Sequence, residues 1–181
     1  MAKPDLSTLL DADIHAGPRD NGKISLLCTR PDFGARIYPK SLKLCPDTGV
    51  EQDRWKTHGW LRLPDGTPDP QIQVAVICKR LLDTVWEGPQ SDTPYPGDTM
   101  VADMDFDSAH LPAGTHLQAG SAELEVSDVY NDGCVKWKVR YGDVAYKFVR
   151  NPDTLSQRPR GMFCRIIRPG IVSIGDHLTR I

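Results

Sequence analysis

The sequence predicts a single, mainly β domain, built as a closed or nearly closed barrel with a few short helices. Three observations favour this fold class: short alternating strands, two hairpin patterns, and frequent turn residues, with 15 Gly and 15 Pro among 181 residues. No repeat or linker interrupts the chain. We therefore expect one domain over residues 1–181, with residues 1–23 as its N-terminal lead-in.

The first half of the chain carries two strand patterns and one helix pattern. Residues 23–29 alternate apolar and polar side chains and place Leu26 on the apolar face, and residues 71–77 alternate in the same way. The period then changes, because apolar residues recur at helical spacing over residues 81–86. We expect a short helix that runs to the break at Gly88.

Two hairpins are predicted in the second half. Residues 116–127 alternate on both sides of a Gly-Ser pair at 120–121, which is typical of two strands joined by a tight turn. At the C-terminus, residues 171–174 and 177–181 flank a Gly-Asp pair at 175–176. We expect the second pair of strands to form a hairpin as well.

A helix is predicted between the hairpins, directly after Gly133. Its apolar residues fall on one side, Gly142 is placed to split it into two helices, and Asn151 with the proline that follows ends it. The side chains that form this apolar side are Trp137, Tyr141, Ala145 and Phe148.

The charge pattern excludes some partners and leaves one question open. A net charge of −2 argues against nucleic-acid or anionic-membrane binding. Residues 95–135 hold eight acids and no Lys or Arg, whereas residues 136–168 hold nine Lys or Arg and two Asp. The basic stretch is either a solvated face or a pocket for a small anion. No signal-peptide or membrane-spanning stretch is present, so we expect a cytoplasmic protein.

Five cysteines, odd in number and never spaced as C-x-x-C, predict neither a disulfide framework nor a zinc site. Cys134 differs from the others because it begins the predicted helix and Lys136, Lys138 and Arg140 follow it. A helix N-terminus and nearby cations stabilise a thiolate, although Asp132 opposes it. From the residues alone, a buried structural cysteine is the favoured interpretation of Cys134.

Two polar patterns are candidates for a metal-binding or ligand-binding site. Asp103, Asp105 and Asp107 lack the Gly and Glu of a calcium loop, so we interpret them as solvated acids of a strand. Asp53 and Arg54, followed by a tryptophan, are typical of an arginine held to clamp a planar or anionic ligand, or of an ordinary surface salt bridge.

Five segments taken in order resemble MOSC-domain proteins, the family named for the C-terminal domain of molybdenum-cofactor sulfurases. They are residues 49–55, 69–83, 96–127, 133–142 and 160–178. The resemblance implies a β-barrel with short helices. It also implies a cysteine that carries sulfur or ligates molybdenum in a pyranopterin cofactor, and Cys134 occupies that cysteine's place.

The resemblance also suggests cofactor-binding residues. Asp53 and Arg54 match a G-D-R element of the family in which Gln52 replaces the Gly. Thr99 stands where many relatives have an Asn, so Thr99 offers a hydroxyl group and not an amide. The basic residues and glycine expected near the cofactor and its phosphate are Arg158, Arg160, Gly161 and Arg165.

Three functions follow as hypotheses. The first is a molybdenum-cofactor enzyme with Cys134 on the metal, which reduces N-hydroxylated or N-oxide substrates with the help of a redox partner. The second is a metal-free persulfide carrier that receives sulfur on Cys134 from a cysteine desulfurase. The third is a cofactor-free lyase or hydrolase that uses Asp53, Arg54 and His58 beside Cys134.

Overall fold

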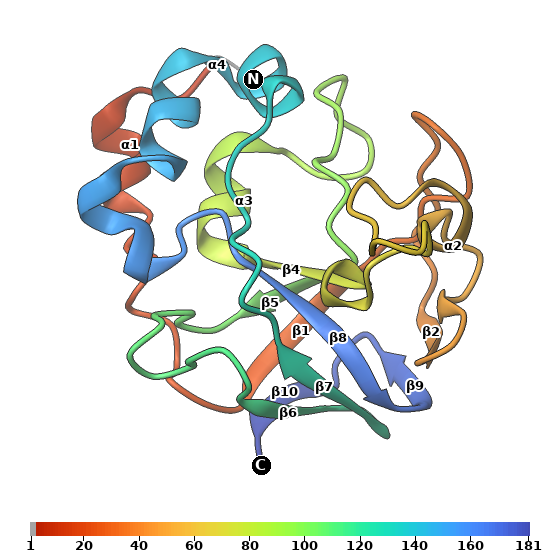
Figure 1. Cartoon of the computed structure of the whole chain (residues 1–181). Helices are drawn as coiled ribbons and strands as arrows, with labels where there is room; N and C mark the ends of the chain where they lie inside the picture. Colours follow the sequence, from red (N-terminus) through yellow and green to blue (C-terminus); the bar gives the residue numbers. More distant parts are fainter. Residues whose placement is uncertain (1–2) are drawn as a thin grey trace.

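A computed structural model describes residues 3–181 and shows a closed barrel of seven strands (Figure 1). The strands follow the order β1-β10-β6-β7-β8-β4-β5, and only β4 and β5 pair in parallel. This architecture confirms the predicted fold class. The strands are β1 (Gly22–Leu27), β4 (Val74–Cys78), β5 (Met100–Asp103), β6 (His116–Ala119), β7 (Ala122–Val126), β8 (Met162–Arg168) and β10 (His177–Arg180).

A second, three-stranded sheet lies beside the barrel in the order β3-β2-β9. Its strands are β2 (Ser41–Cys45), β3 (Gly49–Val50) and β9 (Gly170–Ser173). The expected C-terminal hairpin was wrong in its pairing, because β9 pairs with β2 while β10 pairs with β1 and β6. The turn at residues 175–176 bonds to β1 through Ile24, so it passes the chain from one sheet to the other.

Regular alternation holds in one hairpin and fails in two other strands. The hairpin of β6 and β7 forms with the expected register. In β1 a bulge after Ile24 shifts the buried face, so Leu27 is buried and Leu26 is only half-buried. In β4 every residue is buried, because it lies between β5 and β8.

Helices gather above the barrel in the view of Figure 1. The predicted helices form as α3 (Lys79–Val85) and α4 (Val135–Val149), and the shorter elements are α1 (Leu6–Asp11), α2 (Trp55–His58), η1 (Pro70–Ile72) and η2 (Pro152–Gln157). Gly142, at φ 93° and ψ 172°, splits α4 as predicted. The two halves stay joined because Trp137 Nε1 donates to the Ala145 carbonyl at 3.2 Å. No helix within residues 3–181 is long and apolar enough to cross a membrane.

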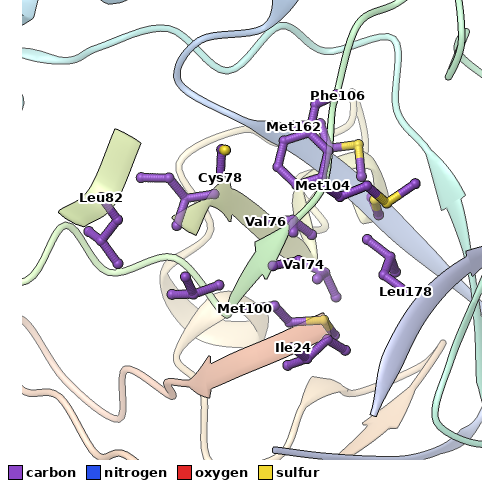
Figure 2. Packing of buried hydrophobic residues seen from close by; sticks show 14 of the residues in the cluster. Ile24, Val74, Val76, Cys78, Leu82, Met100, Met104, Phe106, Met162 and Leu178 are labelled. Carbon is purple, nitrogen blue, oxygen red and sulfur yellow. The ribbon is translucent and has the colours of Figure 1, made fainter. Parts of the chain in front are cut away.

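The barrel interior is filled by apolar side chains from strands that are distant in sequence (Figure 2). Val74 and Val76 of β4 lie among side chains from the neighbouring strands, and Cys78 and Leu82 lie nearby. The remaining labelled side chains of this cluster are Ile24, Met100, Met104, Phe106, Met162 and Leu178.

The three spaced acids after β5 do not share one environment. Asp103 ends the strand and pairs with Arg80, as expected of a solvated acid. Asp105 lies beyond the strand and is buried, and its Oδ1 lies 3.0 Å from His15 Nδ1. The expectation of solvated strand acids was therefore wrong for Asp105, because the lead-in segment packs against this loop.

Candidate functional site

A cavity of about 170 Å³ lies where three segments meet: the loop before β2, the loop after α3, and the first half of α4. Two arginines, from the first and third of these segments, face the cavity, and no acid lines it. The lining residues are Gly34, Arg36, Tyr38, Trp86, Pro89, Ser91, Thr93, Pro94, Tyr95 and Arg140. The cavity is therefore electropositive, with hydroxyl and aromatic groups around it.

Arg36 lies flat against the backbone at Gly97. Gly97 has φ +105°, and a Cβ there would lie 2.8 Å from Arg36 Nη2, so only glycine leaves room for the guanidinium. Arg36 Nη1 donates to the Ala35 carbonyl at 2.6 Å, while its buried Nε has no hydrogen-bond partner. Burial lowers the pKa of Arg36, and the charge of Arg140 lowers it further, against the opposing effect of Cys28. An anion would relieve this loss of solvation.

The first half of α4 holds one wall of the cavity in place. Arg140 Nη1 donates to the carbonyls of Tyr95 and Pro96 at 3.1 and 3.2 Å. Tyr141 Oη donates to the Pro94 carbonyl at 2.6 Å. Because Arg140 uses Nη1 for these two bonds, it both fixes the loop and presents its charge to the cavity.

Three aromatic rings contact one another along the cavity at steep angles. The rings of Trp86 and Tyr95 lie 4.7 Å apart, and Tyr38 meets Tyr95 edge-on at 5.7 Å. Flat walls of this kind suit a planar ligand.

Arg160 lies beneath this region and is already neutralised. Its Nη1 and Nη2 donate to Asp98 Oδ1 and Oδ2 at 2.8 and 2.9 Å, and both residues are buried. The guanidinium also lies 4.5 Å from the centre of the Trp137 ring. Gly161 has φ +93° and packs directly on the Val76 carbonyl, so its role here is close backbone approach.

Two further predicted arginines lie outside the cavity. Arg158 adopts φ +47°, and its Nη1 donates to the carbonyls of Phe106 and Leu111 at 3.3 and 2.6 Å, so it holds the loop after β5. Arg165 on β8 pairs with Glu125 on β7, with 2.8 Å between Nε and Oε1. Both contacts are internal to the fold.

The G-D-R-like element folds as a turn despite its glutamine. Gln52 has φ +57°, so it adopts the left-handed conformation that favours glycine. Asp53 accepts hydrogen bonds from Arg30 N, Nε and Nη2 and from Trp55 N, and its side chain has no exposed area. Asp53 therefore positions the loops, while Arg54 lies under the ring of Phe33 at 4.6 Å.

Cys134 is the exposed cysteine of the chain and directly precedes α4. Its side chain makes no capping hydrogen bond. Six residues separate it from Arg140, which corresponds to about 9 Å along a helix axis. Cys134 is not among the residues that line the cavity, and it is connected to the cavity through the first half of α4. It is more exposed than Cys28 and Cys78, which are buried.

The structure thus brings together a different set of arginines from the set that the sequence predicted. Arg140 lies in the basic stretch of residues 136–168, for which a pocket for a small anion is one of the two interpretations of the sequence, so that stretch carries a signal for Arg140. Arg36 had no signal, because it is far from that stretch in sequence. Thr99 is buried, and its hydroxyl accepts a hydrogen bond from Ala75 N at 3.3 Å, so this hydroxyl makes its contact inside the barrel.

No group of three or more His, Cys, Asp or Glu side chains within residues 3–181 is arranged to hold a metal ion. A metal that arrives held by its own organic ligand needs only one further donor from the protein. Cys134 is an accessible donor of the soft kind that such a metal accepts.

Solved structures match most of the chain. A protein described only as hypothetical is 19% identical with a TM-score of 0.62, over 90% of this chain and 69% of that one. The YuaD protein of Bacillus subtilis is 18% identical with a TM-score of 0.61 (87% and 94%), and YiiM of Escherichia coli is 18% identical with a TM-score of 0.56 (88% and 69%). No protein-family model and no curated protein matches the sequence.

The fold of this chain is therefore similar to the folds of YuaD and YiiM. At these identities the likeness establishes the fold alone.

Proposed function

We propose that this chain holds a pyranopterin molybdenum cofactor with Cys134, Arg36 and Arg140, and reduces N-hydroxylated or N-oxide substrates. The observation that carries the proposal is the acid-free cavity, in which α4 supplies one arginine and is preceded by the exposed cysteine. The sequence resemblance supplies the class of cofactor.

The residues present fit such a group in three respects. The charges of Arg36 and Arg140 suit the phosphate, and the half-buried ring of Tyr38 offers an aromatic surface to the planar pterin. Cys134 offers the sulfur donor. The cavity is smaller than the roughly 300–1,000 Å³ of ordinary small-molecule sites, so it encloses only one end of a ligand of this size.

Each of these residues has a separate task. Arg36 and Arg140 bind and orient the anionic end, and Tyr141 keeps the adjoining wall fixed to α4. Cys134 supplies the protein ligand. When bound, the cofactor supplies two-electron chemistry at an N–O bond. Reduction of a hydroxylamine consumes two electrons and two protons and releases water, so an external electron donor is required.

Metal and pterin analysis of the full chain tests this proposal. Protein purified from cells grown with molybdate is expected to carry nearly stoichiometric molybdenum and a pterin that fluoresces after oxidation. Cys134→Ser should lose the metal, and Arg36→Gln should weaken retention of the pterin. Cys45→Ser is the matched control, because Cys45 is the other cysteine with exposed area.

Wild-type protein that carries neither metal nor pterin, and that accepts neither on reconstitution, would sink the proposal. Metal retained by Cys134→Ser would remove Cys134 from the site.

A persulfide carrier is the second candidate, favoured by the exposed Cys134 side chain outside the cavity. The Cys134 thiolate attacks the terminal sulfur of a desulfurase persulfide, a new S–S bond forms, and the donor cysteine leaves as a thiolate. Intact mass after incubation with a cysteine desulfurase and cysteine should increase by one sulfur atom in the wild type and not in Cys134→Ser. An unchanged wild-type mass argues against this candidate.

A further inference from the structure

Arg54 is a charged side chain that its own fold leaves unpaired. The neighbouring Asp53 is fully used by Arg30 and by the Trp55 amide. The charges of Asp53 and Asp32 act on Arg54, but among residues 3–181 no carboxylate lies within ion-pair distance of its guanidinium. Its Nε and Nη1 are buried and have no hydrogen-bond partner. The large majority of buried side-chain donors have a hydrogen-bond partner, so these two nitrogen atoms are exceptions that need an explanation.

The cover over Arg54 is an exposed aromatic ring. Phe33 lies 4.6 Å above the guanidinium and is 64% exposed, and the edge of the ring meets His58 at 5.1 Å. Gly34 follows at φ +79° with open space around it. One face of the ring is thus held by a cation, and the ring presents apolar surface to solvent on a loop with room to move.

The same short loop joins Arg54 to the cavity. Phe33 covers Arg54, while Gly34 and Arg36, one and three residues later, line the cavity. The charge of Arg36 also lowers the pKa of Arg54, after the larger effects of burial and of Arg30. Phe33 and Arg54 do not line the cavity, but this loop places Phe33 next in sequence to a residue that does.

We propose that Arg54 and Phe33 form a substrate subsite that binds the carboxylate and the aromatic ring of an acidic aromatic substrate. A single guanidinium matches the charge and the planar shape of one carboxylate, and Phe33 offers a stacking face. This inference rests on the proposed function and adds to it the class of substrate: an aromatic N-oxide or N-hydroxylated compound that carries a carboxylate.

A matched pair of probes tests the subsite. Nicotinate N-oxide and nicotinamide N-oxide have nearly the same shape and differ in the charge of one group. Calorimetry on the purified full chain should show that the carboxylate binds about 10- to 100-fold more tightly, as expected for one charge-assisted hydrogen-bonded pair. Arg54→Gln should abolish the difference, while Arg19→Gln, at an exposed arginine, should leave it unchanged.

Phe33→Ala provides a second variant that changes only an exposed side chain. It should weaken both probes by a similar factor, about threefold to tenfold, because the stacking face is lost for both. Equal affinity of the wild type for the two probes, or a preference that survives Arg54→Gln, would overturn the subsite.

These binding results are independent of turnover. A carboxylate preference without reduction of the N-oxide would refute the proposed function and support the subsite. Reduction without that preference would do the reverse.

Discussion

The free energy of unfolding should depend strongly on the buried ion pair of Arg160 and Asp98. The two side chains form two parallel hydrogen bonds of 2.8 and 2.9 Å, and they are 9% and 1% exposed. Removal of one partner leaves the other charge buried and uncompensated, which costs about 3–5 kcal/mol. This is a large part of the roughly 5–15 kcal/mol that stabilises a typical domain.

Urea unfolding of Asp98→Leu, Arg160→Met and the double variant measures this cost. With an m value of about 2 kcal/mol/M, each single change should lower the midpoint by roughly 1.5–2.5 M. The double variant should be more stable than either single variant, because no unpaired charge remains. Losses under about 1 kcal/mol in the single variants, or a double variant that loses the sum of both, would refute the reasoning.

Three further predictions concern a turn, a histidine and the cysteines. Gln52→Gly should stabilise the protein by up to about 1 kcal/mol in urea, because Gln52 has φ +57°; a loss would show that the turn is not strained. Burial lowers the pKa of His15, but hydrogen bonds to Asp105 and Gln157 and the charges of Asp105 and Asp107 together raise it more, so the net shift is upward. The stabilisation from His15 is therefore complete below its ordinary pKa of 6.5 and is lost as the pH rises through its pKa in the folded protein. The melting temperatures of the wild type and of His15→Gln should differ most near pH 5 and converge above about pH 8. A difference that stays constant with pH would contradict this prediction. In native protein, a maleimide should label Cys134, and also Cys45, whose pKa is lowered by hydrogen bonds to its sulfur; labelling of the buried thiols at the same rate would be contrary to the structure. These buried thiols are Cys28, Cys78 and Cys164, and burial raises the pKa of Cys28 and of Cys164 to about 12.

Local sequence signals predicted elements better than they predicted partners. The break of α4 at Gly142 and the β6–β7 hairpin follow from residue type and period, since both depend on a few neighbouring residues. The pairing partner of β9 could not be predicted in this way, because β2 lies more than 100 residues earlier in the chain. The sequence carries no local signal for the bulge in β1 either, because one extra residue leaves the composition of the strand unchanged.

The site shows the same division. The helix that follows Cys134 was predictable, because it depends on Gly133 and on the helical period, whereas the exposure of Cys134 was expected only from the family resemblance. The sequence could not predict whether an arginine is free or neutralised, because the partner of Arg160, Asp98, is 62 residues away in the chain. Arg36 became part of the site only because Gly97, 61 residues later, leaves room for its guanidinium.

The distribution of acids explains how this barrel keeps several arginines together. Asp53 neutralises Arg30 and Asp98 neutralises Arg160, and these two pairs are the buried supports on which the loops rest. Arg36 and Arg54 receive no such acid within residues 3–181, and each keeps buried nitrogen atoms without a partner. A domain selected for stability alone would pair or expose them, because desolvated charge costs free energy. An anion that binds to these arginines would offset the cost of their desolvation, so the unpaired arginines mark the face of the barrel where we expect ligand binding.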